Sequence, residues 1–147
     1  MKLIEELEQT RDKTLLYFDL SEADLSKCYA VGKWNIKQLL NHIVDAETVM
    51  YDRIRRVISK PNQAIWGFDQ DAWATGLDYN QFPLEINKDL FQSVRTAIIY
   101  LAEQYYESLG SNRFVHSETG VRTLKDEFDK VVWHNEHHLN QISQALA

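Results

Sequence analysis

The sequence predicts an all-α fold, a four-helix bundle with a long connector between the second and third helices. Three observations support this prediction: four long stretches place apolar residues at helical spacing, no stretch shows a convincing strand pattern, and typical capping residues stand at several predicted helix ends. We expect residues 1–147 to form a single domain, because a chain of this length can bury a core and shows no internal repeat, low-complexity tract or linker.

The first predicted helix runs from Leu3 to about Leu20. Acidic residues come early in it and basic residues later, an order that suits the helix dipole. The apolar residues at helical spacing are Leu3, Ile4, Leu7, Leu15 and Phe18. Residues 21–32 then form a connector.

The second predicted helix begins after Asn35, a good N-cap, and Trp34 before it can act as a hydrophobic staple. It continues to about Ser59, and Pro61 follows its end. Its apolar stripe consists of Ile36, Leu39, Leu40, Ile43, Ala46, Met50, Ile54 and Val57. His42 lies on the flank of this stripe.

Residues 60–83 form the longest connector. They include both prolines and two of the four tryptophans, so we expect the segment to be ordered and packed over the bundle. Its length would also allow the second and third helices to be non-adjacent.

The third predicted helix spans residues 84–109, and Gly110 is a suitable C′ residue after it. Residues 114–122 show little periodicity and form either a short extended hairpin or a plain loop. The fourth helix begins at Thr123, an N-cap with Asp126 three residues later, and continues to the end of the chain.

The net charge of −6 argues against a nucleic-acid partner, since phosphate binding needs clustered basic residues. The basic residues that come close together are Arg53, Arg55, Arg56 and Lys60, on a helical face flanked by acids. No apolar run approaches a membrane span, and the N-terminus lacks the apolar region of a signal peptide. The single Cys28 excludes an internal disulfide and suits a reducing compartment, so we expect a cytoplasmic protein. No nearby histidine or basic residue gives this cysteine a nucleophilic role.

A helical wheel separates the three histidines of the last helix. His134 and His138 are one turn apart on a flank of its apolar side, with Gln141 on the same edge, whereas His137 points almost directly away. Two imidazoles at this spacing can chelate one divalent metal, but a stable site usually needs a third ligand.

A three-histidine site would combine His42 with His134 and His138. Three neutral imidazoles between two helices suit Zn²⁺, Ni²⁺ or Fe²⁺ and leave a position open for water or substrate. A metal in such a site lowers the pKa of bound water or of a bound thiol. On spacing alone, a structural interpretation is the more common one for such residues: the pair on the last helix lies at the surface or core edge, and His42 is a hydrogen-bonded structural residue.

Three segments resemble the DinB-like (damage-inducible protein B) family. Residues 34–47, WNIKQLLNHIVDAE, resemble its W-s-x-x-e-x-l-x-H-l-x-d-x-E segment, and residues 134–142, HNEHHLNQI, look like its C-terminal H-x-x-x-H-l-x-Q-I signature. Residues 69–74, DQDAWA, are similar to the D-e-d-a-W-a loop of one branch. The three segments stand in the right order and are spread along the chain from residue 34 to residue 142.

This resemblance implies a four-helix metalloprotein, commonly a homodimer, that acts on a small-molecule substrate. Carried over by position, the metal ligands would be His42, His134 and His138, in agreement with the wheel. Characterised relatives include transferases and isomerases in which the metal activates the thiol of a low-molecular-weight cofactor. Many other members have no assigned activity.

Further candidates for the site are Asp69, Asp71 and Gln141. Either aspartate could serve as a catalytic base or orient a ligand, or could simply cap a helix or turn. Gln141 lies on the flank of His138 and could orient the substrate.

The aromatic residues of the connector, Trp66, Phe68 and Trp73, either line a pocket or pack on the bundle. Trp133 on the outer face of the last helix is a candidate for a dimer contact, or is covered by the connector. We expect His116 to be exposed in the loop before the last helix.

Two functions follow as hypotheses. The first is a metal-dependent enzyme, a thiol-dependent S-transferase or isomerase that activates a thiol or water at the three-histidine site. The second is a non-catalytic metal-binding or stress-associated bundle that acts through dimerisation. An open cleft beside the histidines favours the enzyme, and a closed or filled one favours the binding module.

Overall fold

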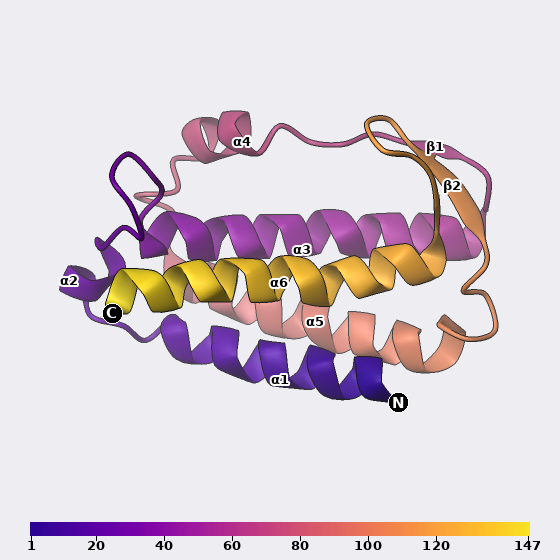
Figure 1. Ribbon diagram of the computed structural model, residues 1–147, viewed down its shortest axis with the longest axis horizontal. Helices are drawn as coiled ribbons and strands as arrows, with labels where there is room; N and C mark the ends of the chain where they lie inside the picture. The colour runs from indigo at the N-terminus through magenta and orange to yellow at the C-terminus, as the bar shows by residue number, and fades with distance from the viewer.

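The computed structural model describes residues 1–147 and has four long helices arranged as a bundle (Figure 1). The long helices are α1 (Lys2–Tyr17), α3 (Ile36–Ser59), α5 (Leu84–Tyr105) and α6 (Leu124–Leu146). The short elements are α2 (Glu22–Leu25), β1 (Ala64–Ile65), α4 (Gln70–Gly76), β2 (Arg113–His116) and β3 (Gly120–Thr123). The predicted four-helix bundle is confirmed. None of the helices has both the length and the apolar character needed to span a bilayer.

The order of the helices around the bundle differs from their order in the chain. α3 packs against α5 and α6, and α1 packs against the same two helices, so α1 and α3 occupy opposite corners. α1 and α6 run in one direction and α3 and α5 in the other (Figure 1). The second and third long helices are therefore adjacent and parallel, and the long connector is needed to return the chain along the length of the bundle.

Both predicted N-caps are confirmed as capping boxes. At the start of α3, Oδ1 of Asn35 accepts from the backbone N–H of Gln38 at 2.8 Å, and Oε1 of Gln38 accepts from the Asn35 N–H at 2.9 Å. Thr123 and Asp126 make the same exchange at the start of α6, at 3.2 and 2.9 Å. These caps fix where the histidine-bearing helices begin, and so fix which residues share a face.

A buried polar network ties the four long helices together. The fully buried Arg95 of α5 donates from Nε and Nη2 to the carboxylate of Glu47 on α3, at 2.5 and 3.0 Å. Nη1 donates to the Leu7 carbonyl and to Oγ1 of Thr10 on α1, both at 2.8 Å. Nη2 also donates to Oδ1 of Asn135 on α6 at 2.8 Å. One guanidinium group thus contacts all three other long helices.

A small three-stranded sheet stands at one end of the bundle, in the order β1-β2-β3. The β2–β3 pair is antiparallel, so the hairpin alternative for residues 114–122 is correct, and β1 adds to it in parallel through Ala64 opposite Val115. The expectation that His116 is exposed is wrong, because its side chain lies on the inner face of β2 and is 4% exposed. Its Nδ1 accepts from the N–H groups of Glu118 and Thr119 at 3.1 and 3.3 Å.

Two helices end earlier than the sequence predicts. α1 ends at Tyr17 and α5 at Tyr105, and turns follow both. Gly110 does not adopt the positive φ expected of a C′ glycine. A Cβ there would lie 2.2 Å from the carbonyl oxygen of Tyr106 and 2.6 Å from Cγ of Lys125. The glycine is required because the end of α5 and the start of α6 approach closely.

Candidate metal centre

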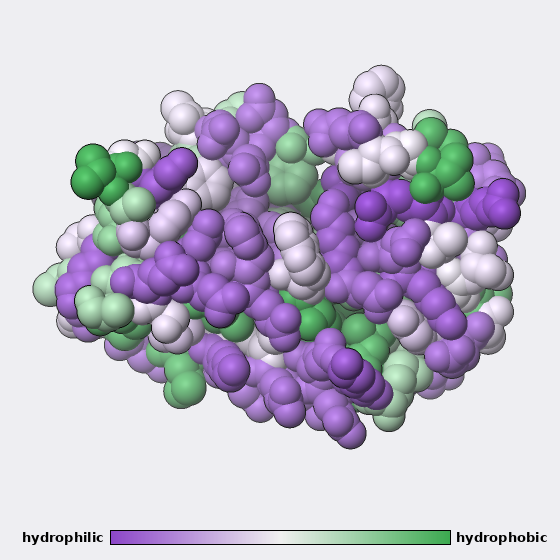
Figure 2. Space-filling view, viewed as in Figure 1, coloured by the Kyte–Doolittle hydropathy of each residue, from purple (hydrophilic) through white to green (hydrophobic).

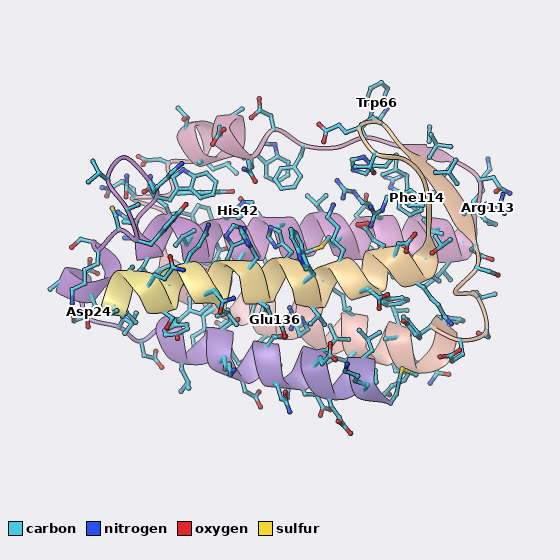
Figure 3. All side chains as sticks on the ribbon, viewed as in Figure 1. Asp24, His42, Trp66, Arg113, Phe114 and Glu136 are labelled. Carbon is cyan, nitrogen blue, oxygen red and sulfur yellow. The ribbon has the colours of Figure 1, made fainter.

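Three histidine side chains meet between α3 and α6. Nε2 of His134 lies 3.0 Å from Nε2 of His42 and 3.1 Å from Nε2 of His138. His42 is fully buried and His138 is 8% exposed, and their ligand atoms lie within 4.8 Å of one another. Figure 3 shows the His42 side chain at the contact between the two helices. The structure thus brings together the three histidines that the sequence predicted as ligands.

The separations of these nitrogens match those of ligands to one ion. Two imidazole nitrogens each about 2.0–2.1 Å from a metal, at bond angles between about 90° and 109°, are about 2.8–3.4 Å apart. The two measured Nε2–Nε2 distances fall within this range.

Hydrogen bonds alone do not satisfy the cluster. Oε1 of Gln141 lies 2.7 Å from Nδ1 of His138, and because a carbonyl oxygen only accepts, that nitrogen carries the proton. Nε2 of neutral His138 then presents a lone pair to His134. A single proton on Nε2 of His134 cannot make good hydrogen bonds to both His138 and His42. A cation in the middle of the three nitrogens would satisfy all of them.

Burial keeps these imidazoles neutral. Burial, with a smaller contribution from the charge of His138, lowers the pKa of His42 to about 3. Burial and the charges of His138 and His42 lower the pKa of His134 to about 2, and burial also lowers the pKa of His138. Neutral imidazoles offer lone pairs at neutral pH, so the donor set fits Zn²⁺, Ni²⁺ or Fe²⁺.

Aromatic packing holds the His42 ring in place. The ring lies 5.0 Å from the Trp34 ring and 6.3 Å from the Phe68 ring, between centroids. Its Nδ1 is buried and has no hydrogen-bond partner. Packing therefore holds the His42 ring in position, as the hydrogen bond to Gln141 does for the His138 ring.

The cluster lies between two hollows. His42 and His134 line one of about 220 Å³, and His138 lines another of about 370 Å³. The other residues of the first hollow are Ala46, Met50, Arg53, Phe68, Gln70, Glu118 and Lys130. Those of the second are Tyr29, Gly32, Lys33, Trp34, Leu39, Gln70, Asp71, His137 and Gln141. Gln70 of α4 lines both, so the connector forms the wall between them.

Residues 6–142 match the family model of the DinB superfamily. This chain belongs to the DinB superfamily. The resemblance seen in the three sequence segments is therefore confirmed.

Two relatives extend the comparison. A protein of Oceanobacillus iheyensis named as a candidate metal-dependent hydrolase is 33% identical over 128 residues, which cover 87% of this chain and 73% of the relative. A similarly named protein of Halalkalibacterium halodurans is 26% identical, over 89% of this chain and 76% of its own length.

The fold is also that of a solved structure, YfiT from Bacillus subtilis. That protein is described as a probable metal-dependent hydrolase with an unusual four-helix bundle topology. The match has a TM-score of 0.90 at 23% sequence identity and covers 98% of this chain and 83% of YfiT.

The other site candidates of this DinB chain separate into three groups. Asp69 caps α4, since its Oδ1 accepts from the Ala72 N–H at 3.0 Å, which fits the structural interpretation. Asp71 and Gln141 both line the hollow beside His138. His137 is exposed and lies outside the three-nitrogen cluster. It nevertheless lines the hollow beside His138, with ring centroids 5.0 Å apart, so the expectation that it points directly away from this edge is wrong.

The aromatic residues also differ from one another. Phe68 lines the hollow beside His42, and Trp73 packs on it with ring centroids 4.6 Å apart. Trp66 is 80% exposed and points away from the bundle (Figure 3). Trp133 is 62% exposed, so the connector does not cover it, and its ring stacks on His137.

Sequence reasoning missed three charged residues of the first hollow, Arg53, Glu118 and Lys130. The missed signal was helical spacing counted from the histidines. Lys130 precedes His134 by four residues, and Arg53 follows His42 at a spacing that returns to the same face. Glu118 comes from the β2–β3 turn, and no local pattern places it beside the helices.

Proposed function

We propose that this chain is a divalent-metal-dependent enzyme in which His42, His134 and His138 bind the metal and a small molecule is the substrate. The observation that supports this most directly is that Nε2 of His134 lies 3.0 Å from Nε2 of His42 and 3.1 Å from Nε2 of His138. The names of the relatives support metal-dependent hydrolysis as the reaction.

A divalent ion held by this ligand set would act as a Lewis acid and lower the pKa of a water molecule or thiol bound to it. The chain itself orients the ligands, through Gln141 at His138 and through Trp34 and Phe68 at His42. The aromatic rings also exclude water from the buried side of His42. The hollow beside His42 and His134 gives the substrate access to the ligands.

Thiol-dependent S-transfer or isomerisation is the second candidate reaction, and one observation favours it. The three histidines border two hollows and not one. The hollow beside His138 is lined by the polar residues Lys33, Asp71 and Gln141. A hydrophilic low-molecular-weight thiol could occupy that side while an electrophile occupies the other.

The open hollows favour an enzyme over a non-catalytic or stress-associated binding module. A module that holds its metal for stability needs no cavity beside it. We further propose a single-domain, cytoplasmic protein that forms a homodimer, with the exposed Trp133 at the dimer contact.

Metal content tests the proposal first. Untagged protein and the His138→Ala variant would be compared by elemental analysis after gel filtration. We expect near-stoichiometric Zn, Ni or Fe in the wild type and its loss in the variant. No bound metal in the wild type, even after reconstitution, would refute the proposal. Loaded protein would then be assayed for ester and amide hydrolysis and, with added low-molecular-weight thiols, for conjugation to an electrophile.

A further inference from the structure

Two buried arginines of this bundle differ in the number and length of the hydrogen bonds that their guanidinium groups donate. Arg95 makes hydrogen bonds of 2.5–3.0 Å from all three guanidinium nitrogens. Arg53 is 3% exposed, but its two hydrogen bonds, to Oε1 of Glu127 and to the Trp66 carbonyl, are both 3.4 Å long. Its Nε is buried without a partner. Arg53 thus has donor capacity that the protein does not use.

Arg53 stands about three helical turns after His42 on α3 and faces the hollow that borders the candidate metal centre. It lines the same hollow as His42 and His134, and it follows His42 along one face of α3 by way of Ala46 and Met50. Side chains on a helix lean toward its N-terminus, so an arginine at this spacing leans toward the histidine.

A second cation enters the hollow from the opposite helix. Lys130 lies one turn before His134 on α6, is half-buried, and makes no hydrogen bond or ion pair. Burial lowers the pKa of its ammonium group, a sign that its charge is poorly compensated. Lys130 and His134 therefore line one side of the same hollow, with Arg53 and His42 on the opposite helix.

The carboxylates near these cations leave room for an anion. Glu127 is fully buried and holds Arg53 only through the long contact, with its Oε2 unpartnered. Glu118 lines the hollow from the exposed turn of the hairpin and forms no ion pair. Its charge would oppose a dianion more than a monoanion, and the hollow is only about 220 Å³.

We propose that Arg53 and Lys130 bind the carboxylate of a small substrate whose apolar part packs on Met50 and Phe68. This inference rests on the proposed function, because it places the reacting group of that substrate at the three-histidine site. The substrate is then a small organic acid, with its carboxylate bound in the same hollow that His42 and His134 line.

Binding of a matched pair of probes tests the subsite. Phenylacetate and its neutral analogue phenylacetamide have similar shape, and their dissociation constants would be measured by calorimetry on zinc-loaded protein. We expect wild type to prefer the carboxylate at least tenfold. Lys130→Met and Arg53→Met should each reduce this preference at least fivefold. Lys125→Met and Arg56→Met serve as controls, because both residues form exposed ion pairs outside the hollow. Neither substitution should change the preference for phenylacetate over phenylacetamide.

Lys130→Met decides the matter if Arg53→Met fails to fold, because Lys130 has no partner that its loss would leave unpaired. The proposed subsite is wrong if wild type does not prefer phenylacetate over phenylacetamide, or if Lys130→Met leaves that preference unchanged. Glu118→Gln should strengthen phenylacetate binding two- to threefold, and weaker binding would contradict the proposal. Zinc content measured on the same samples separates the two inferences. If wild type binds no zinc, the proposed function fails, and the same probe pair still tests the subsite on metal-free protein.

Discussion

The side-chain oxygen of Gln141 accepts a hydrogen bond from Nδ1 of His138, one turn earlier on α6, at 2.7 Å. This bond fixes the tautomer of the histidine and points the lone pair of Nε2 at the other two imidazoles. Among the three histidines, His138 is the one whose second nitrogen is oriented by a side-chain amide, since Nδ1 of His42 has no partner. Hydrogen bonds of this kind raise the basicity of a ligand and restrict its ring.

Gln141→Leu should therefore lower zinc affinity about tenfold, within the range seen when such orienting groups are lost. Competition with a chromophoric chelator measures the affinity. Gln141→Glu keeps an acceptor and serves as the control, with affinity close to wild type. An unchanged affinity in the leucine variant would show that the hydrogen bond does not support the ligand.

The contrast between neighbouring histidines gives a second prediction. His42→Ala and His138→Ala should each lower metal affinity more than tenfold, because each removes one of three ligand nitrogens. His137→Ala should leave it nearly unchanged, since His137 is exposed and outside the cluster. The same chelator competition applies to all three. Equal losses would contradict the assignment of His137.

The ion pair of Arg95 and Glu47 predicts a large effect on stability. Arg95→Met leaves the buried Glu47 carboxylate unpaired, so the free energy of unfolding should fall by about 3–5 kcal/mol. Denaturant unfolding of metal-free protein measures this change. Arg56→Met, which removes an exposed ion pair with Asp52, should cost no more than about 1 kcal/mol. Similar losses in both variants would argue against the buried network.

The pH dependence of stability follows from the lowered pKa values. In metal-free folded protein, the pKa of His42 is about 3 and that of His134 about 2, against 6.5 for a free imidazole. Between these values the unfolded chain binds more protons, so the free energy of unfolding falls as pH falls below about 6.5. From pH 7 to pH 5 each imidazole contributes a loss of up to about 2 kcal/mol.

Denaturant unfolding at pH 7, 6 and 5 after chelator treatment tests this. His42→Gln removes one of the buried imidazoles, so the stability of this variant should fall less steeply with decreasing pH. A wild-type slope equal to that of the variant would mean that His42 is protonated in the folded state.

The helices and the histidine pair of α6 were predictable because their signals are local, whereas His42 was assigned through the family resemblance, since 92 positions separate it from His134. Asn35 and Thr123 are capping residues whose partners stand three positions later, and the ligand pair on α6 is four residues apart. The sheet was only partly predictable, because β1 has two residues and pairs with a strand some fifty positions later. A segment of two residues is too short to show a periodicity, so the sequence pattern does not predict such a strand.

The charged residues of the first hollow were missed for a different reason. Arg53 stands among Arg55 and Arg56 in the sequence, and only the packing of α3 on α6 and the connector shows that it alone is buried. The burial of His116 is not predictable from its neighbours in the sequence, because it depends on the hairpin folding back. In both cases long-range contacts decide the burial of a polar residue, and composition does not reveal them.

The Arg95 network leads us to expect that the bundle folds without the proposed metal. Asn135 is bonded to Arg95 and follows His134 directly, so contacts that need no ion already hold the backbone beneath the ligands. In small domains whose metal organises the core, by contrast, loss of the ion unfolds the chain. We therefore expect the bundle to stay folded without the proposed ion and to exchange one divalent ion for another. The identity of an ion bound by the three histidines would then depend on metal supply and on the preferences of imidazole ligands, and not on the ion present when the chain folds.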